Sequence, residues 1–239
     1  MTHIIHPFLL AVLLTFMGGS THRVDSLPVP DASSVTAEDP CLSLYEALGL
    51  EGKVELYIFQ KAYNGYLQIS ERKKNILTLI DFTKPSNTER LFVIDIDARK
   101  ILQQSLVAHG KNSGHLYATR FSNNINSHQS SLGFYLTSET YIGSNGYSLR
   151  LEGLEEGINS NARRRAIVIH GARYANPSVC TGGGRLGRSF GCPALPEALN
   201  KPVIDTIKEG SVLYIYAEDQ QYLSKSKFSA PSPTTPHHS

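Results

Sequence analysis

The sequence predicts a mainly β fold with a few helices, in which short strands build a β-sandwich or a barrel-like sheet. Three observations lead to this fold class. Runs of β-branched and apolar residues recur through the middle of the chain, as in Ile76–Phe82 and Leu91–Ile96. Glycine and asparagine turns separate these runs. Helical patterns are confined to a pair before the first strand and to one late segment.

Two helices are expected before the first strand. Asp39 and Pro40 suit the N-cap and the first turn of a helix that ends at Gly49 or Gly52. A second helix is expected from about Lys53 to Tyr66, and its apolar residues recur at helical spacing. Those apolar residues are Val54, Tyr57, Ile58 and Ala62. We expect this pair to pack on the outside of the main domain.

The strands follow in the middle of the chain. In order, they are expected at Ile76–Phe82, Leu91–Ile96, Ile101–Ala108, Leu116–Phe121, Leu132–Thr137, Tyr147–Leu151, Ile167–Ile169 and Val212–Tyr216. A turn over residues 97–100 joins the second and third of them into a hairpin. One late helix is expected before the last strand, with Asn200 as its cap and Gly210 at its end.

Both chain ends are expected to lie outside the folded domain. Phe8–Met17 is an apolar run before Gly18-Gly19-Ser20, and it is shorter than the ~20 residues of a membrane span. It is therefore interpreted as part of a signal peptide, with an uncleaved anchor as the alternative. The expected divisions are a signal peptide (1–20), a polar linker (21–38), the folded domain (39–220) and a disordered, Ser- and Pro-rich tail (221–239). We expect export to the periplasm or cell envelope, with no stable membrane span after cleavage.

The composition fits one globular domain. The chain has 239 residues, of which 41% are hydrophobic and 18% are charged, so it can bury a sizeable core. The formal net charge of +2 is too small to indicate a nucleic-acid partner. The one basic run, Arg163–Arg165, precedes an apolar strand. We interpret it as the solvated start of that strand rather than as a binding patch.

The candidate catalytic residues lie between Ile167 and Pro196. A short apolar strand leads to His170, a glycine-rich loop follows, and Cys192 comes directly after a glycine. A thiol is weakly ionised at neutral pH and needs a base to become a strong nucleophile. An imidazole within reach takes that proton and later returns it to the leaving group. Cys192 and His170 are therefore the candidate nucleophile and general base; the alternative is that each is a structural residue.

Neighbouring residues could support such a pair. No Asp or Glu lies between His170 and Cys192, so the backbone carbonyl of Gly171 is the candidate that orients the imidazole. Gly191 allows backbone N–H groups to approach a developing oxyanion. Pro193 has no N–H. A local oxyanion hole would therefore use the amides of Gly191 and Cys192.

The three cysteines leave several pairings open. In an oxidising compartment, Cys41–Cys180 is the only disulfide that leaves Cys192 as a free thiol. A disulfide between Cys180 and Cys192 would remove the candidate nucleophile. No spacing demands a bridge, and we expect none. Zinc bound by His170, Cys180 and Cys192 is a further alternative, but the spacings match no regular zinc pattern, so no metal is expected.

These residues resemble those of a known family. His170-Gly171, a loop, and then Ser189-x-Gly191-Cys192 is similar to the signature of the L,D-transpeptidase (YkuD-like) catalytic domains, and more closely to their murein L,D-transpeptidase branch. The segments that resemble this branch are 108–114, 127–135 and 184–196. The resemblance extends over about residues 41–218. It implies an L,D-transpeptidase-like sandwich or barrel, with Cys192 as nucleophile, His170 as base and Ser189 in support.

Two positions depart from the wider family's motif. Phe190 stands where a histidine is usual, and Ala194 stands where an arginine or asparagine is usual. The substrate-binding arginine is therefore expected at Arg185 or Arg188. The resemblance also indicates His109 as a wall of the active-site cleft.

The resemblance implies an enzyme that acts on peptidoglycan stem peptides. Cys192 would attack the carbonyl of an L-residue in the stem and release D-Ala, and an amine would then take the acyl group. No cofactor is needed. With water as the acceptor, the same site would give an L,D-carboxypeptidase or endopeptidase. A non-catalytic cell-wall-binding module is the alternative from another class.

Overall fold

The computed structural model describes residues 39–228. The predicted signal peptide (1–20), the predicted linker (21–38) and residues 229–239 of the predicted tail lie outside the described residues. Residues 39–228 fall within one unit of the chain.

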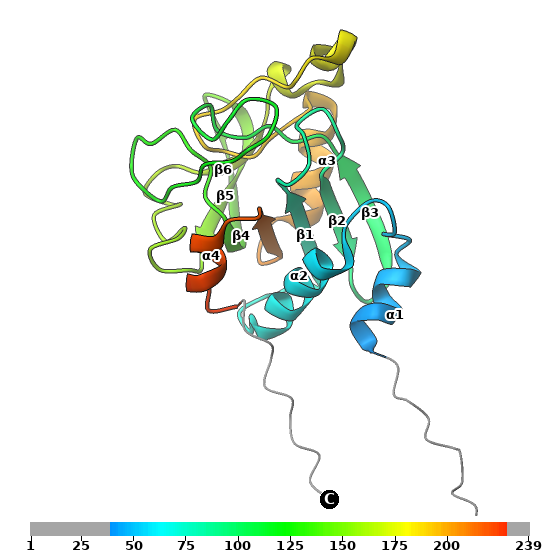
Figure 1. Cartoon of the computed structure of the whole chain (residues 1–239). Helices are drawn as coiled ribbons and strands as arrows, with labels where there is room; N and C mark the ends of the chain where they lie inside the picture. The colour runs from blue at the N-terminus through cyan, green and yellow to red at the C-terminus, as the bar shows by residue number, and fades with distance from the viewer. Residues whose placement is uncertain (1–38, 229–239) are drawn as a thin grey trace, which may run out of the picture. The chain divides into compact units, whose positions relative to one another are not determined.

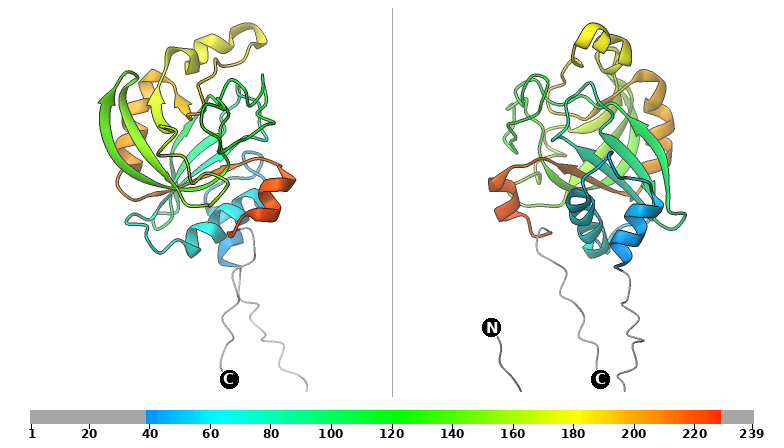
Figure 2. Two further views of the ribbon diagram at one scale, coloured as in Figure 1. Left: turned by 90° about the vertical axis from the view of Figure 1, so that its left-hand side faces the viewer. Right: turned by 45° about the vertical axis from the view of Figure 1, so that its right-hand side comes forward.

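An eight-stranded sheet forms the centre of this unit, in the order β3-β2-β1-β8-β4-β5-β6-β7. Neighbouring strands pair antiparallel, except that β1–β8 and β6–β7 pair parallel. The strands are β1 (Ile76–Asp81), β2 (Leu91–Asp95), β3 (Lys100–Ser105), β4 (Gly133–Gly143), β5 (Gly146–Gly153), β6 (Val168–Gly171), β7 (Ala194–Leu195) and β8 (Val212–Tyr216). Figure 2 shows how the long hairpin of β4 and β5 curls.

The two edges of the sheet meet, which makes it a near-barrel. Shortly after β3, Ala108 forms an antiparallel bridge with Ala194 of β7. The amide of Ala108 donates to the carbonyl of Ala194 over 2.8 Å. The predicted fold class, mainly β with a few helices and a sandwich or barrel-like sheet, is therefore confirmed.

Helices cover the sheet (Figure 1). They are α1 (Pro40–Ala47), α2 (Leu56–Gln68), α3 (Glu197–Ile207), α4 (Gln220–Lys225) and the 3₁₀ helices η1 (Arg173–Ala175) and η2 (Pro177–Gly183). α2 packs on β1 and β8, whereas α3 packs on β5 and β6. Asp39 caps α1 as expected, because its side chain accepts from the amide of Cys41. None of the helices within residues 39–228 combines the length and apolar character needed to cross a membrane.

The fit of α2 on the sheet depends on a glycine inside the helix. Gly65 lies inside α2, and a Cβ built there would come 2.0 Å from the ring of Phe134 on β4. Phe134 stacks in turn on Tyr214 of β8, with ring centroids 4.1 Å apart. Gly65 therefore allows close packing of helix and sheet and does not end the helix.

One predicted strand is wrong, and so is the predicted cap of the late helix. Residues 116–121 form no strand; Ala118 makes only an isolated bridge to nearby Gly114. The late helix begins at Glu197, so Asn200 lies inside it and is not its cap. The buried side chain of Asn200 donates instead to the carbonyl of Tyr147, a partner on β5 that sequence spacing cannot indicate.

Several elements were not predicted, among them β7, α4 and the two 3₁₀ helices. Ala194-Leu195 forms β7 although a proline stands on either side. It was not predicted because its partner strand, β6, lies more than twenty residues earlier in the sequence. The predicted tail begins with the helix α4, in which Tyr222 is buried, and Phe228 beyond it is also buried. These aromatic side chains hold the first part of that tail against the domain.

Candidate active site

His170 lies on β6, between β5 and β7. It pairs with Ser148 on one side and with Ala194 on the other, and only 3% of it is exposed. Its Nδ1 lies 3.0 Å from the carbonyl oxygen of Gly171, the contact expected from the sequence. Because a carbonyl only accepts, Nδ1 carries the proton and Nε2 has the free lone pair. Burial lowers the pKa of His170, so its ring is neutral at pH 7 and can act as a base.

Cys192 lies beside the same strand. In the parallel register His170 pairs with Ala194, which brings Cys192, two residues earlier, beside Val168. The amide of Val168 donates to Sγ over 3.5 Å, and Sγ lies 3.6 Å from the carbonyl oxygen of Ala166. Burial raises the pKa of the Cys192 thiol. The thiol is thus protonated at rest and must leave the Ala166 carbonyl before it can pass a proton to His170.

Ser189 folds the turn that carries the thiol. Its Oγ accepts from the amide of Gly191 over 3.0 Å and donates to the carbonyl of Cys192 over 2.6 Å. The prediction that the Gly191 amide serves an oxyanion hole is therefore wrong, because that N–H is already bonded. Gly191 is needed for another reason: it has a φ of +128°, and a Cβ there would lie 2.8 Å from the carbonyl oxygen of Gln129. The Cys192 amide remains as the local candidate donor.

His109 does not form a wall of an open cleft, contrary to the expectation. Its side chain is fully buried, and its Nδ1 lies 2.9 Å from Nη2 of Arg90. Burial and the neighbouring guanidinium lower the pKa of His109 to about 3, so its ring is neutral. The backbone carbonyl of His109 accepts from the amide of Ser189 over 3.0 Å. The backbone of His109 therefore holds one end of the turn that carries the nucleophile, residues 189–192.

Arg90 anchors this support. It is completely buried, and its guanidinium donates twice to the carbonyl of Val107, once to the carbonyl of Lys84 and once to His109. Burial lowers the pKa of Arg90 to about 9, so the group is still charged at pH 7. A sequence pattern cannot identify this residue, because exposed and buried arginines look alike along the chain.

Replacing Arg90 with glutamine is expected to cost about 3–5 kcal/mol of unfolding free energy, because buried acceptors lose their donors. Urea unfolding of the purified protein measures this loss. Arg120→Gln is the matched control: Arg120 is exposed, and its loss should change stability by less than about 0.5 kcal/mol. Equal urea midpoints for the two variants would contradict the anchoring role of Arg90.

The two arginines expected to bind substrate lie on the loop before the nucleophile. Arg188 donates to the carbonyls of Lys111 and Gly114 over 3.0 and 2.8 Å, and Arg185 donates to the carbonyl of Leu186 over 2.7 Å. Both residues are partly exposed. These contacts fix the loop, and the role of either arginine toward substrate stays a prediction.

Arg165 is the site residue that the sequence interpretation missed. It was grouped with Arg163 and Arg164 as the solvated start of a strand, and those two are exposed as expected. The guanidinium of Arg165 instead lies beside Gly191: a Cβ built on this glycine would be 3.2 Å from Nη2. The three consecutive arginines carry no signal that separates the third from the others.

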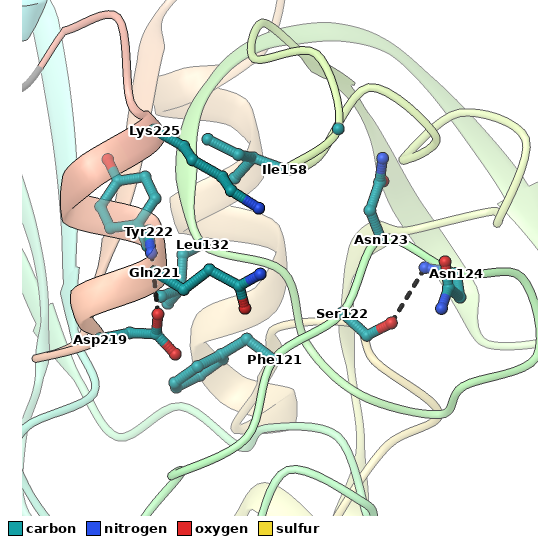
Figure 3. A pocket seen from close by; sticks show the side chains of 11 residues that line it. Phe121, Ser122, Asn123, Asn124, Leu132, Ile158, Asp219, Gln221, Tyr222 and Lys225 are labelled. Atoms are coloured by element: carbon teal, nitrogen blue, oxygen red, sulfur yellow. Dashed lines mark hydrogen bonds between the residues drawn. The ribbon is translucent and has the colours of Figure 1, made fainter.

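A polar pocket of about 260 Å³ lies elsewhere in the domain (Figure 3). Residues 121–124, Leu132 and residues 157–158 line it together with residues of α4 and Asp219, and neither Cys192 nor His170 is among its lining residues. Ser122 relates it to the site, because the Ser122 carbonyl accepts from Arg165.

The structure also bears on the cysteine pairings and on the zinc alternative. Cys41, Cys180 and Cys192 are all free thiols. Over residues 39–228, no three side chains of His, Cys, Asp or Glu come together in a way that could hold a metal ion.

Comparison with known proteins gives one match at the level of sequence. Residues 50–216 match the model of a family described as L,D-transpeptidase catalytic domain. No curated protein sequence matches.

Several solved structures resemble the chain at low identity. An L,D-transpeptidase from Mycobacterium smegmatis has a TM-score of 0.38 and 13% identity over 60% of this chain and 59% of that one. The helical cell shape determining protein Pgp2 from Campylobacter jejuni has a TM-score of 0.40 and 13% identity, over 69% and 57%. For an L,D-transpeptidase (Yku) from Stackebrandtia nassauensis the values are 0.36 and 13%, over 74% and 76%. The chain thus spans less than two thirds of the Mycobacterium smegmatis protein.

Proposed function

Because the chain belongs to the L,D-transpeptidase catalytic domain family, we propose that it is an exported cysteine acyl-transferase that acts on peptidoglycan stem peptides through Cys192. The parallel register of β6 and β7 is the observation that carries this proposal. It brings the thiol of Cys192 against the strand that bears His170, a neutral and oriented imidazole. The family match supports the substrate class, since the stem peptide is what such a domain acts on.

The first half-reaction forms a thioester. The Nε2 lone pair of His170 takes the thiol proton while Sγ attacks the carbonyl carbon of the L-residue that precedes D-Ala in the stem. The amide of Cys192 stabilises the oxyanion of the tetrahedral intermediate. The C–N bond then breaks, and D-Ala leaves with the proton that His170 returns. The acyl group remains on Cys192.

The second half-reaction releases the enzyme. A side-chain amine of another stem peptide attacks the thioester carbon and passes a proton to His170. The C–S bond breaks, an amide is formed, and the thiolate regains its proton. Arg185 or Arg188, each partly exposed on the nucleophile loop, would hold a substrate carboxylate.

Burial of both groups determines how the pair works. It raises the pKa of Cys192 and lowers that of His170, so the neutral thiol and neutral imidazole are favoured over a thiolate–imidazolium pair. Proton transfer therefore accompanies the attack on substrate, as in general base catalysis.

Intact mass of the purified protein after incubation with a disaccharide-tetrapeptide tests this proposal. The expected result is an increase by the mass of the acyl donor without its D-Ala, together with free D-Ala in solution. Products that contain a second stem indicate transfer to an amine, and a free tripeptide acid indicates water as the acceptor. No adduct and no D-Ala, with Cys192 shown to be a free thiol, would contradict the proposal and favour a binding module.

A further inference from the structure

We infer that Arg165 is a positioning residue of the nucleophile: its guanidinium holds the segment 122–131 against Gly191 and places a positive charge beside the thiolate that forms on Cys192. The use of that thiolate in acyl transfer rests on the proposed function. The position of the charge rests on the contacts alone.

Four hydrogen bonds tie Arg165 to one segment of the chain. Nη1 donates to the carbonyl of Ser122 over 2.6 Å and to Oγ of Ser131 over 2.5 Å. Nη2 donates to Oγ of Ser127 over 3.1 Å and to the carbonyl of Gln129 over 2.5 Å. The segment has no strand of its own, and this guanidinium is one of the groups that hold it, beside partners such as Ser113 and Asn161.

The same segment packs on the residue directly before the nucleophile. A Cβ on Gly191 would lie 2.8 Å from the Gln129 carbonyl oxygen and 3.2 Å from Nη2 of Arg165. On the other side, the Ser130 hydroxyl donates to the Gly191 carbonyl over 3.0 Å. Any shift of the guanidinium would therefore move the backbone that holds Cys192.

The charge of Arg165 is not neutralised by a carboxylate. All four acceptors are neutral oxygens, and within residues 39–228 the ion pairs of the domain involve other side chains. Partial burial keeps bulk water from screening the cation fully. The guanidinium lowers the pKa of Cys192, although burial of the sulfur outweighs it. Tyr174 and His170 are the other titratable groups near the thiol.

The backbone between Arg165 and β6 is strained. Ala166 has a φ of +53°, a left-handed conformation in which the Cβ of an L-residue crowds the following carbonyl oxygen. The Ala166 carbonyl is also the group that the resting thiol contacts. Strain at such a position persists where surrounding contacts over-determine it. Here those contacts include the four bonds of the Arg165 side chain and the bond from the Ala166 amide to the carbonyl of Arg163.

The test compares Arg165→Gln, Arg165→Lys and Arg164→Gln, each in a Cys180→Ser background. Arg164 is the matched control, because it is adjacent, exposed and of equal charge. The first measurement is the alkylation of Cys192 by iodoacetamide as a function of pH, followed by peptide mass mapping. Burial raises the pKa of Cys41 to about 12, so that thiol does not interfere.

Arg165→Gln is expected to move the midpoint of the alkylation profile up by about one pH unit, which is about tenfold slower alkylation below it. Arg165→Lys should keep the midpoint near that of the control. It should nevertheless form the acyl adduct about tenfold more slowly, because an ammonium cannot reproduce the four bonds of a planar guanidinium. Circular dichroism identifies any variant that does not fold.

Two results would overturn the inference. One is a midpoint for folded Arg165→Gln equal to that of Arg164→Gln. The other, decisive if the glutamine variant does not fold, is adduct formation by Arg165→Lys as fast as by Arg164→Gln. Alkylation needs no peptidoglycan, so an Arg165-dependent midpoint without any adduct from the tetrapeptide would reject the proposed function and leave the charge effect standing.

Discussion

Replacing Cys192 with alanine is expected to abolish the acyl-enzyme adduct and to lower D-Ala release at least ~10³-fold. The thiol is the group that would carry the acyl chain, and it contacts β6 through the amide of Val168. Its two hydrogen bonds, with Val168 and Ala166, are long, and alanine keeps the Cβ that packs toward the core, so the loss of the thiol should leave the fold intact. Intact mass and D-Ala release, measured beside thermal unfolding, separate loss of chemistry from loss of structure.

Cys180→Ala is the matched control for this prediction. Cys180 is also a free and partly exposed thiol, and it lies on the 3₁₀ helix η2. Its variant should form the adduct at the rate of the parent protein. An adduct of the same mass on Cys192→Ala would show that another residue is the nucleophile.

Replacing His170 with glutamine is expected to slow adduct formation about 10²–10⁴-fold at pH 7, because no base remains to take the thiol proton. The pH dependence of the parent protein provides a second signature. Burial lowers the pKa of His170 below its ordinary value, so the ring stays neutral and active somewhat below pH 6.5. The rate should then fall as the pH falls through the lowered pKa, since a protonated ring cannot act as a base.

The pH profile of adduct formation checks both parts of this prediction. The His170→Gln profile should lack the acidic limb, and its rate should rise with pH as hydroxide ionises the thiol directly. His115→Gln is the control, because His115 is exposed and its loss should leave the profile unchanged. An acidic limb that persists in His170→Gln would mean that another group is the base.

Some elements follow from local chemistry, and the sequence alone predicts them. Apolar, β-branched runs such as Leu91–Ile96 correspond to strands that are almost wholly buried. Asp39 caps its helix because a carboxylate two residues before an amide can always reach it. The contact between His170 and the carbonyl of Gly171 is also local, because the two residues are adjacent in the chain. For Cys192, the residue types and their order indicate the catalytic role that we propose.

The contacts between residues far apart in the sequence depend on how the whole chain folds. The register of β6 and β7 brings the thiol of Cys192 beside Val168. A two-residue strand between prolines is too short to show an alternating pattern in the sequence. The Ser189 hydroxyl accepts a hydrogen bond from the amide of Gly191. The guanidinium of Arg165 donates to the carbonyl of Ser122, a partner that sequence spacing does not indicate. Burial then determines the charge states of His170 and Cys192. The burial of a side chain and the pairing of a strand both depend on residues far away in the sequence. A local sequence pattern therefore does not predict them.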